Sequence, residues 1–278
     1  MSSDKEVIRT RIWEETPEQD NPFSASACYC SGYDVYGEIL GNASWFEYLY
    51  LLFKQQRPTP EQVSLLETLA VALANPGPRD HSVRAAMNAG VGGSTHAASL
   101  IAALAIGAGQ NGGAHEVAIC MEYWQKCGQD LDEWKNILLN QPEINIDIWC
   151  PMEHPPGFDP HGSSCSQPVR QTLTKLAQLS TGVALPWLET NRIELEAVSK
   201  TPLAFTGVAA AALIDVGFDP KQGEMLFLLL RLPGAAAHAL EQEELGWRNY
   251  PFFGDGLTLE NDPGPKTIRQ DEKTAGAK

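Results

Sequence analysis

Residues 107–116 read GAGQNGGAHE, a glycine-interrupted turn that closes one alanine-rich helical stretch and opens another. Upstream, residues 99–109 (SLIAALAIGAG) are almost all small and apolar, which lets two helix backbones approach closely and suits a buried position. Gly112 and Gly113 leave backbone N–H groups bare at the start of the next helix, where they and the helix dipole can hold an anion. A helix–helix turn that needs glycine only for its φ angles is the simpler interpretation, and this stretch alone favours it.

Length and composition are those of a water-soluble protein with a sizeable core. The chain has 278 residues, of which 43% are hydrophobic and 20% charged, so it can form one large domain or two unequal lobes. No apolar run reaches the roughly 18 residues of a membrane span. The first ten residues, MSSDKEVIRT, are polar and lack the features of a signal peptide, so we expect a cytoplasmic protein.

Charge and cysteine usage exclude two kinds of partner. A net charge of −15 argues against nucleic acid, because no basic stripe can replace the counterions of a phosphate backbone. An anionic substrate would therefore need a local arginine cluster. The six cysteines are expected to be reduced. Cys28 and Cys30 form the only close pair, without the second pair that a zinc site needs, and no metal site is predicted.

Helix signals recur along the chain. Thr59-Pro60-Glu61-Gln62 combines an N-cap hydroxyl, a proline at the first helical position and a glutamine at the third. Asn42 or Ser44 can cap a helix that starts at Trp45. No segment alternates convincingly, so strands are not expected and the predicted fold class is all-α. The other expected helices lie within residues 79–104 (broken by glycines), 117–139 (hinged near Gly128), 169–179, 187–198, 207–215 and 221–244.

Polar residues at the glycine and proline breaks favour a site for a polycarboxylate. Guanidinium groups bind carboxylates in a planar fork, and an imidazole can transfer a proton near neutral pH. A proline- and glycine-rich stretch at 140–168 is long enough to be a functional loop. Each residue also has a purely structural alternative, such as a helix-interface contact for a histidine. The set comprises Asp80, His81, Arg84, Asn111, His115, Asp159, His161, Arg170, Arg231, His238 and Arg248.

Six segments, in their order and spacing, resemble the citrate synthase superfamily. The likeness extends over about residues 30–252 and is greatest to the short citryl-CoA lyases and to the C-terminal module of ATP-citrate lyase. The segments are GYDVYGEILGNASWFEYLYLLF (32–53), RPTPEQVSLLETLAVALANPGPRDH (57–81), GAGQNGGAHE (107–116), PPGFDPHG (155–162), TGVAAAALIDVGFD (206–219) and RLPGAAAHALEQ (231–242).

This resemblance implies an all-α homodimer whose subunits have a large and a smaller helical domain that close over the substrate. The large domain would comprise residues 30–115 and 224–258, and the small domain residues 116–223, with an N-terminal arm at 1–29 and a flexible tail at 259–278. The family makes or cleaves the C–C bond between acetyl-CoA and oxaloacetate. It uses no metal or tightly bound cofactor, and the acyl-CoA is a co-substrate.

Site residues follow from the resemblance position by position. His161 matches the histidine that exchanges a proton on the oxaloacetate side, displaced by an apparent insertion of Asp159 and Pro160. Arg231 matches an arginine that binds a substrate carboxylate. The remaining expected substrate-binding residues are His81, Arg170, His238 and Arg248, the last of which the family often sends into the neighbouring subunit's site.

Two positions depart from the family pattern. Asn111 stands where citrate synthases carry the histidine that stabilises the enol, a change that ATP-citrate lyase also tolerates. Thr206 stands where the family has the aspartate that removes or returns the proton at the thioester methyl. A threonine hydroxyl cannot serve as a carboxylate base near neutral pH.

Three hypotheses remain open at this point. The chain is a citryl-CoA lyase or citrate synthase-like enzyme in which another acid, with Asp159 as the named residue, replaces the lost aspartate. Alternatively, it is a catalytically impaired protein that binds CoA or a dicarboxylate as a regulatory or scaffolding subunit. In the third, the site stays active but its substrate is another 3-hydroxy-acyl-CoA or 2-oxo acid. Retention of the arginines favours an anionic ligand in all three.

Overall fold

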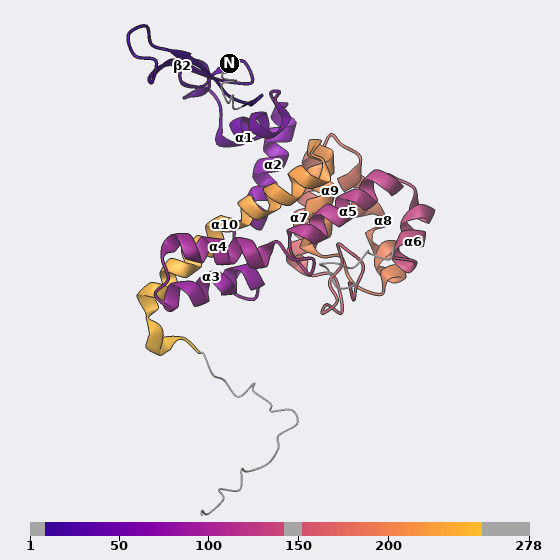
Figure 1. Ribbon diagram of the computed structural model, residues 1–278. Coiled ribbons are helices and arrows are strands. Elements are labelled where there is room, and N and C mark those ends of the chain that lie inside the picture. Colours follow the sequence, from indigo (N-terminus) through magenta and orange to yellow (C-terminus); the bar gives the residue numbers. More distant parts are fainter. Residues whose placement is uncertain (1–8, 142–151, 252–278) are drawn as a thin grey trace, which may run out of the picture.

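The structure is a computed structural model in which residues 9–141 and 152–251 are described. Within these ranges the chain is mainly helical (Figure 1), as the sequence predicts. The α-helices are α1 (Trp45–Lys54), α2 (Pro60–Leu73), α3 (His81–Val91), α4 (His96–Gly107), α5 (Ala114–Cys127), α6 (Leu131–Leu139), α7 (Gln167–Leu179), α8 (Ala184–Ser199), α9 (Phe205–Val216) and α10 (Pro220–Leu245). A π-helical turn, η1 (Val35–Ile39), precedes α1, and a 3-10 turn, η2 (Trp247–Asn249), follows α10. The expected tail lies outside the described residues.

A small antiparallel sheet precedes the helices, and the expectation that the chain has no strands is wrong there. Its order is β1 (Glu14–Pro17), β2 (Ala25–Cys30) and β3 (Tyr33–Asp34). Most of its residues are exposed or half-buried, so the sequence shows no alternation of polar and apolar side chains. The local signal is the tight turn between β2 and β3, where Ser31 and Gly32 both have positive φ.

Helix boundaries follow the local signals in the sequence. Ser44, rather than Asn42, caps α1 and forms a capping box with Glu47. Thr59 caps α2 in the same way with Gln62, as predicted. Gly128 separates α5 from α6 at the expected hinge. The starts of α1 and α2 are confirmed because side-chain oxygens satisfy free N–H groups in the first turn of each of these two helices.

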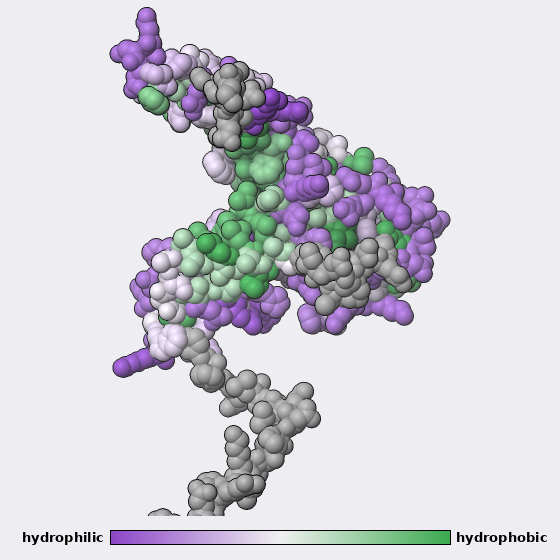
Figure 2. Space-filling view, in the orientation of Figure 1, coloured by the Kyte–Doolittle hydropathy of each residue, from purple (hydrophilic) through white to green (hydrophobic). Residues whose placement is uncertain are grey.

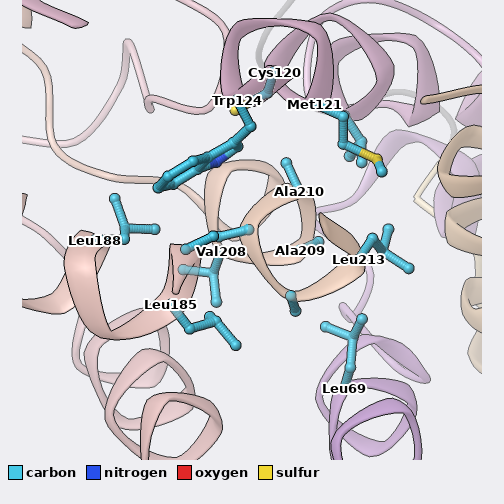
Figure 3. Packing of buried hydrophobic residues seen from close by; sticks show 14 of the residues in the cluster. Leu69, Cys120, Met121, Trp124, Leu185, Leu188, Val208, Ala209, Ala210 and Leu213 are labelled. Carbon is cyan, nitrogen blue, oxygen red and sulfur yellow. The ribbon is translucent and has the colours of Figure 1, made fainter. Parts of the chain in front are cut away.

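Helix α9 forms the centre of the main core. Its residues 208–213 have no exposed surface, and four of them, residues 209–212, are alanines. Small side chains allow α5, α2 and α8 to approach this helix closely, as Figure 3 shows for Trp124, Leu69 and Leu185. The N-terminus of α9, which carries Thr206, is therefore held at a fixed place.

Helix α4 is less buried than its composition predicts. Only Ser99, Ala103 and Gly107 on this helix are buried, against α3 and α10, while Ile101 and Ile106 are 64% and 52% exposed. The expectation of a buried helix is wrong for the single chain, because α4 contacts its neighbours through one face only.

Helix α10 links the α5–α9 group to the α3–α4 pair (Figure 1). Near its middle, the backbone N–H of Gly234 donates a hydrogen bond of 2.7 Å to the carbonyl of Ala74, at the end of α2. A Cβ atom at position 234 would lie 2.4 Å from that oxygen. This close approach fixes the start of the connection from α2 to α3, which carries Asp80 and His81.

We expect Gly234→Ala to lower the free energy of unfolding by about 1–3 kcal/mol, because the added methyl group must push the α2 backbone away from α10. Urea unfolding measures the effect. Ala237→Ser, on the exposed side of α10, is the control and should stay within about 0.5 kcal/mol of the wild type. A wild-type value for Gly234→Ala would show that this crossing is not tight in solution.

Candidate active site

One cleft of about 610 Å³ collects residues from segments far apart in the sequence. Its walls are the connection from α2 to α3, the turn before α5, the loop between residues 154 and 168, the start of α9 and the middle of α10. Seven residues predicted for the site line it: Asp80, His81, Asn111, Asp159, His161, Thr206 and Arg231.

The glycine turn before α5 provides one wall. Gly112 has a φ of +71°, a conformation that favours glycine, and Gly113 is the N-cap without a side-chain hydrogen bond. Glu116, in the first turn of α5, accepts a hydrogen bond of 2.6 Å from the Gly112 N–H through Oε2. The chain's own carboxylate thus takes this amide, at the helix end where a negative charge is favourable. At Gly112, the interpretation as a helix–helix turn that needs glycine for its φ angle therefore holds, and the amide does not require a bound anion.

Glu116 joins three segments around the cleft. The residue is 1% exposed, and its Oε1 accepts hydrogen bonds from the Gly157 N–H at 2.8 Å and from the Thr206 hydroxyl at 2.7 Å. His154 Nε2 lies 3.6 Å from Oε2. A buried carboxylate is stable only with such donors around it. Glu116 therefore ties the glycine turn, the 154–168 loop and the start of α9 together.

The sequence prediction did not single out Glu116 or His154. For Glu116 a signal was present, since a carboxylate three residues after Gly113 falls in the first helical turn, beside free N–H groups. His154 has no comparable signal, because only the folded loop brings it to Glu116.

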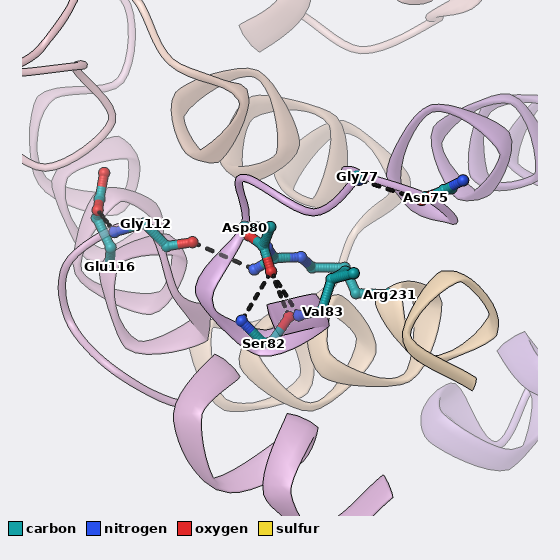
Figure 4. Close-up of polar contacts among 8 residues, drawn as sticks. All are labelled: Asn75, Gly77, Asp80, Ser82, Val83, Gly112, Glu116 and Arg231. Atoms are coloured by element: carbon teal, nitrogen blue, oxygen red, sulfur yellow. Dashed lines mark hydrogen bonds and ion pairs between the residues drawn. The ribbon is translucent and has the colours of Figure 1, made fainter. Parts of the chain in front are cut away.

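Arg231 is a buried cation that contacts the same glycine turn as Glu116, from the other side of Gly112 (Figure 4). It is 7% exposed, forms an ion pair with Asp80, and donates a hydrogen bond of 3.2 Å to the Gly112 carbonyl. Its guanidinium lies 4.8 Å from the centre of the Phe227 ring. Burial lowers the pKa of Arg231 to about 10, which leaves the side chain charged at neutral pH.

Asp80 has two structural roles beside Arg231. Its Oδ1 caps α3 by accepting from the backbone N–H groups of Ser82 and Val83, and its Oδ2 faces Arg231 (Figure 4). The arginine is thereby oriented but already paired. A ligand carboxylate would have to share Arg231 with Asp80 or displace it.

His161 reaches the cleft from a short, ordered turn. The Asp159 carboxylate accepts from the His161 N–H at 2.8 Å, and the Asp159 N–H donates to the Pro202 carbonyl at 2.8 Å. The His161 side chain is exposed, as are those of Asn111 and His81 at the cleft. These three side chains are placed to meet a ligand.

Three residues to which the resemblance assigns substrate binding do not line the cleft, and neither do Arg84 and His115. Arg170 lies on the exposed face of α7 beside Lys175. His238 Nε2 is 3.1 Å from the Asn75 Oδ1, and its Nδ1 is 3.2 Å from Glu241. Arg248 lies in η2, beyond the end of α10. Their substrate-binding roles stay predictions, and that of Arg248 requires a second subunit.

The described cysteines, Cys28, Cys30, Cys120, Cys127 and Cys165, are free thiols; Cys150 lies outside the described residues. Burial and the nearby charge of Glu116 raise the pKa of Cys120 far above its ordinary value. This thiol is therefore protonated beside the cleft and does not act as a nucleophile.

Convergent polar groups in a mainly apolar cleft, with a buried cation on one wall and a buried carboxylate on another, are typical of small-molecule sites in enzymes. The class of protein that fold and cleft define is thus a helical protein with a polar-lined cleft of the kind that binds a small molecule. Known structures narrow this class to one fold.

The chain has the citrate synthase-like fold. It superposes on citryl-CoA lyase from Hydrogenobacter thermophilus with a TM-score of 0.70 and 21% identity, over 97% of this chain and 100% of that one. ATP citrate lyase from Methanothrix soehngenii, in complex with citrate and coenzyme A, matches with a TM-score of 0.69 and 17% identity over 98% of this chain and 43% of its own. Citrate synthase from Thermoplasma acidophilum matches with a TM-score of 0.52 and 14% identity, over 80% and 59% of the two chains. No family model and no curated protein matches the sequence.

These likenesses confirm the predicted fold. Among the described residues, no helix has the length and apolarity needed to cross a membrane.

Proposed function

We propose that the protein is a citryl-CoA lyase or citrate synthase-like enzyme, which makes or cleaves the C–C bond between an acyl-CoA, acetyl-CoA, and a 2-oxo acid, oxaloacetate. The observation that carries the proposal is the cleft in which His81, Asn111, His161 and Arg231 meet, although they come from segments far apart in the sequence. The fold shared with citryl-CoA lyase supports it.

The roles follow from the chemistry of each side chain. Arg231 binds a ligand carboxylate by a charge-assisted hydrogen bond, which is strengthened by its burial. His161 exchanges the proton of the carbonyl or hydroxyl oxygen of the oxo acid. The Asn111 amide can donate a hydrogen bond to the thioester oxygen as negative charge develops there.

A direct assay tests this function. Purified protein is incubated with citryl-CoA, and separately with acetyl-CoA and oxaloacetate, while acetyl-CoA and free thiol are measured. We expect turnover in at least one direction. Calorimetric titration with citrate, oxaloacetate and acetyl-CoA accompanies the assay. Absence of turnover over pH 6 to 9 would exclude the enzyme on these substrates.

Two observations favour a second function if turnover is absent. Thr206 provides no carboxylate to the cleft, and Arg231 is already paired with Asp80. In that case the protein binds CoA or a dicarboxylate as a regulatory or scaffolding subunit. Titration then shows binding of CoA or a dicarboxylate, while the assay shows no turnover. An enzyme that acts on a different substrate would instead bind neither citrate nor oxaloacetate.

We further propose that the protein is a homodimer, whose interface includes the apolar face of α4 and α10. Figure 2 shows hydrophobic side chains gathered over these helices, and the exposed ones include Ile101, Ile106, Met225, Leu229 and Leu240. Contiguous exposed apolar surface of this kind marks an interaction site. A dimer would also bury the outer face of α4, which is exposed in the single chain. The cytoplasmic location expected from the sequence stays a prediction.

We expect a dimer in size-exclusion chromatography with light scattering, and Ile101→Lys should shift it toward the monomer because a charge cannot be buried unpaired in an apolar interface. Ile193→Lys is the matched control, since Ile193 is 71% exposed on α8, away from this face. A dimer that is unchanged by Ile101→Lys would place the interface elsewhere.

A further inference from the structure

Thr206 and the buried carboxylate of Glu116 meet at the wall of the ligand cleft, which both residues line. Thr206 lines the cleft at the start of α9, while its hydroxyl donates a hydrogen bond of 2.7 Å to Glu116 Oε1. Glu116 is 1% exposed, so a ligand that contacts Thr206 is connected through the threonine hydroxyl to a charge that solvent barely reaches.

The direction of this hydrogen bond determines what Thr206 offers to the cleft. The Thr206 hydroxyl is the donor to Glu116 Oε1, so its single hydroxyl proton points at Glu116. The lone pairs of the Thr206 oxygen remain free to accept a proton from the cleft. Thr206 therefore behaves as an acceptor there, in spite of being a neutral alcohol.

The surroundings hold Glu116 in this arrangement. The N–H groups of Gly112 and Gly157 donate to the two carboxylate oxygens at 2.6 and 2.8 Å, and each comes from a different segment of the cleft wall. His154 Nε2, at 3.6 Å, is the nearby titratable group that faces Oε2. The carboxylate cannot turn away from Thr206 without breaking contacts with both walls.

We propose that Thr206 and Glu116 form a two-residue proton relay that exchanges the proton on the acyl-CoA carbon next to the thioester. This inference rests on the proposed function. In the direction of enolate formation, the C–H bond breaks and its electron pair forms the enolate. The proton passes to Thr206 Oγ1, while the Thr206 hydroxyl proton passes to Glu116 Oε1. Thr206 is again a hydroxyl, Glu116 is neutral, and cleavage runs the same transfers in reverse.

Thr206 contacts the ligand in this scheme, whereas Glu116 acts through it and is a positioning residue. Asp159, the acid expected from the sequence to replace the missing aspartate, is less well placed. Its Oδ1 accepts from the His161 N–H at 2.8 Å and so holds its own turn together. The relay therefore predicts that Asp159→Asn, which keeps that acceptor, retains proton exchange.

The test is exchange of the methyl protons of acetyl-CoA with deuterated water in the presence of oxaloacetate, followed by mass spectrometry of the thioester. We expect Thr206→Val to lower the exchange rate by about 10²-fold or more, since a positioned acid or base contributes about 10²- to 10⁴-fold. Thr206→Ser, which keeps the hydroxyl, should retain most of the rate. Glu116→Gln should lose exchange, and adding Thr206→Asp to that variant should restore it, because the aspartate places a carboxylate directly at the cleft.

Thr190→Val and Glu189→Gln, on the exposed part of α8, are matched controls. Thermal unfolding and oxaloacetate binding show whether each variant is folded. If Glu116→Gln does not fold, the comparison of Thr206→Val with Thr206→Ser decides the matter. The relay would be overturned if Thr206→Val exchanged protons at the wild-type rate. It would also be overturned if the single substitution Asp159→Asn abolished the exchange. If the wild type shows neither exchange nor turnover, the proposed function itself fails.

Discussion

Arg231→Met should lose measurable binding of citrate and oxaloacetate and lower the free energy of unfolding by about 3–5 kcal/mol. The arginine is 7% exposed and is paired with Asp80, which is itself mostly buried. Methionine fills a similar volume but leaves the Asp80 carboxylate without its counter-charge. Breaking one partner of a buried ion pair has this order of cost, because the remaining charge stays desolvated.

A double variant separates stability from binding. Asp80→Asn keeps a side chain that can cap α3, so adding it to Arg231→Met removes the unpaired charge at little cost to the helix. We expect the double variant to recover most of the lost stability in urea unfolding but none of the carboxylate binding in calorimetry. Wild-type citrate binding by either variant would show that Arg231 does not receive the ligand.

The local part of the fold was predictable because it depends on neighbouring residues. Thr59 and Gln62 satisfy each other's backbone N–H groups wherever the helix lies in the molecule. The same holds for Ser44 at α1 and for the break at Gly128. Such signals fix where helices begin and end, and they give the all-helical class.

Burial and the sheet depended on partners that local patterns do not show. The alanines of α4 and of α9 look alike in sequence, yet residues 209–212 of α9 are fully enclosed, while Ile101 and Ile106 of α4 face outward. The difference lies in how many helices surround each one. Strands β1 and β2 were missed because neither face of this sheet is well buried, so nothing imposes an alternating pattern.

At the candidate site, the family resemblance identified which residues to consider, and the structure showed which of them contact one another. Thr206 was recognised as a departure from a pattern, whereas its bond to Glu116 spans 90 residues and arises only on folding. Asp80 was noted in the sequence without a partner, and the fold supplies Arg231. A sequence can thus show that a carboxylate is missing from one position without showing that another lies behind it.

His161→Ala should lower kcat by about 10²- to 10⁴-fold, the usual contribution of a positioned general acid or base. Its imidazole is exposed at the cleft, and the hydrogen bond that shapes its turn uses the backbone N–H, which alanine retains. We therefore expect an unchanged unfolding midpoint, in contrast to Arg231→Met. His96→Ala is the matched control, since His96 is an exposed histidine on α4 that pairs with Glu243.

The pair of results at His161 and Arg231 discriminates between the two proposed functions. If the protein is an enzyme, His161→Ala loses turnover while citrate binding through Arg231 survives, because a proton donor acts mainly in the transition state. If the protein is a binding subunit, His161→Ala leaves the stability unchanged and alters ligand affinity only slightly. Only Arg231→Met then abolishes binding. Full turnover in His161→Ala would assign the proton transfer to another residue in the cleft, of which His81 is the exposed alternative.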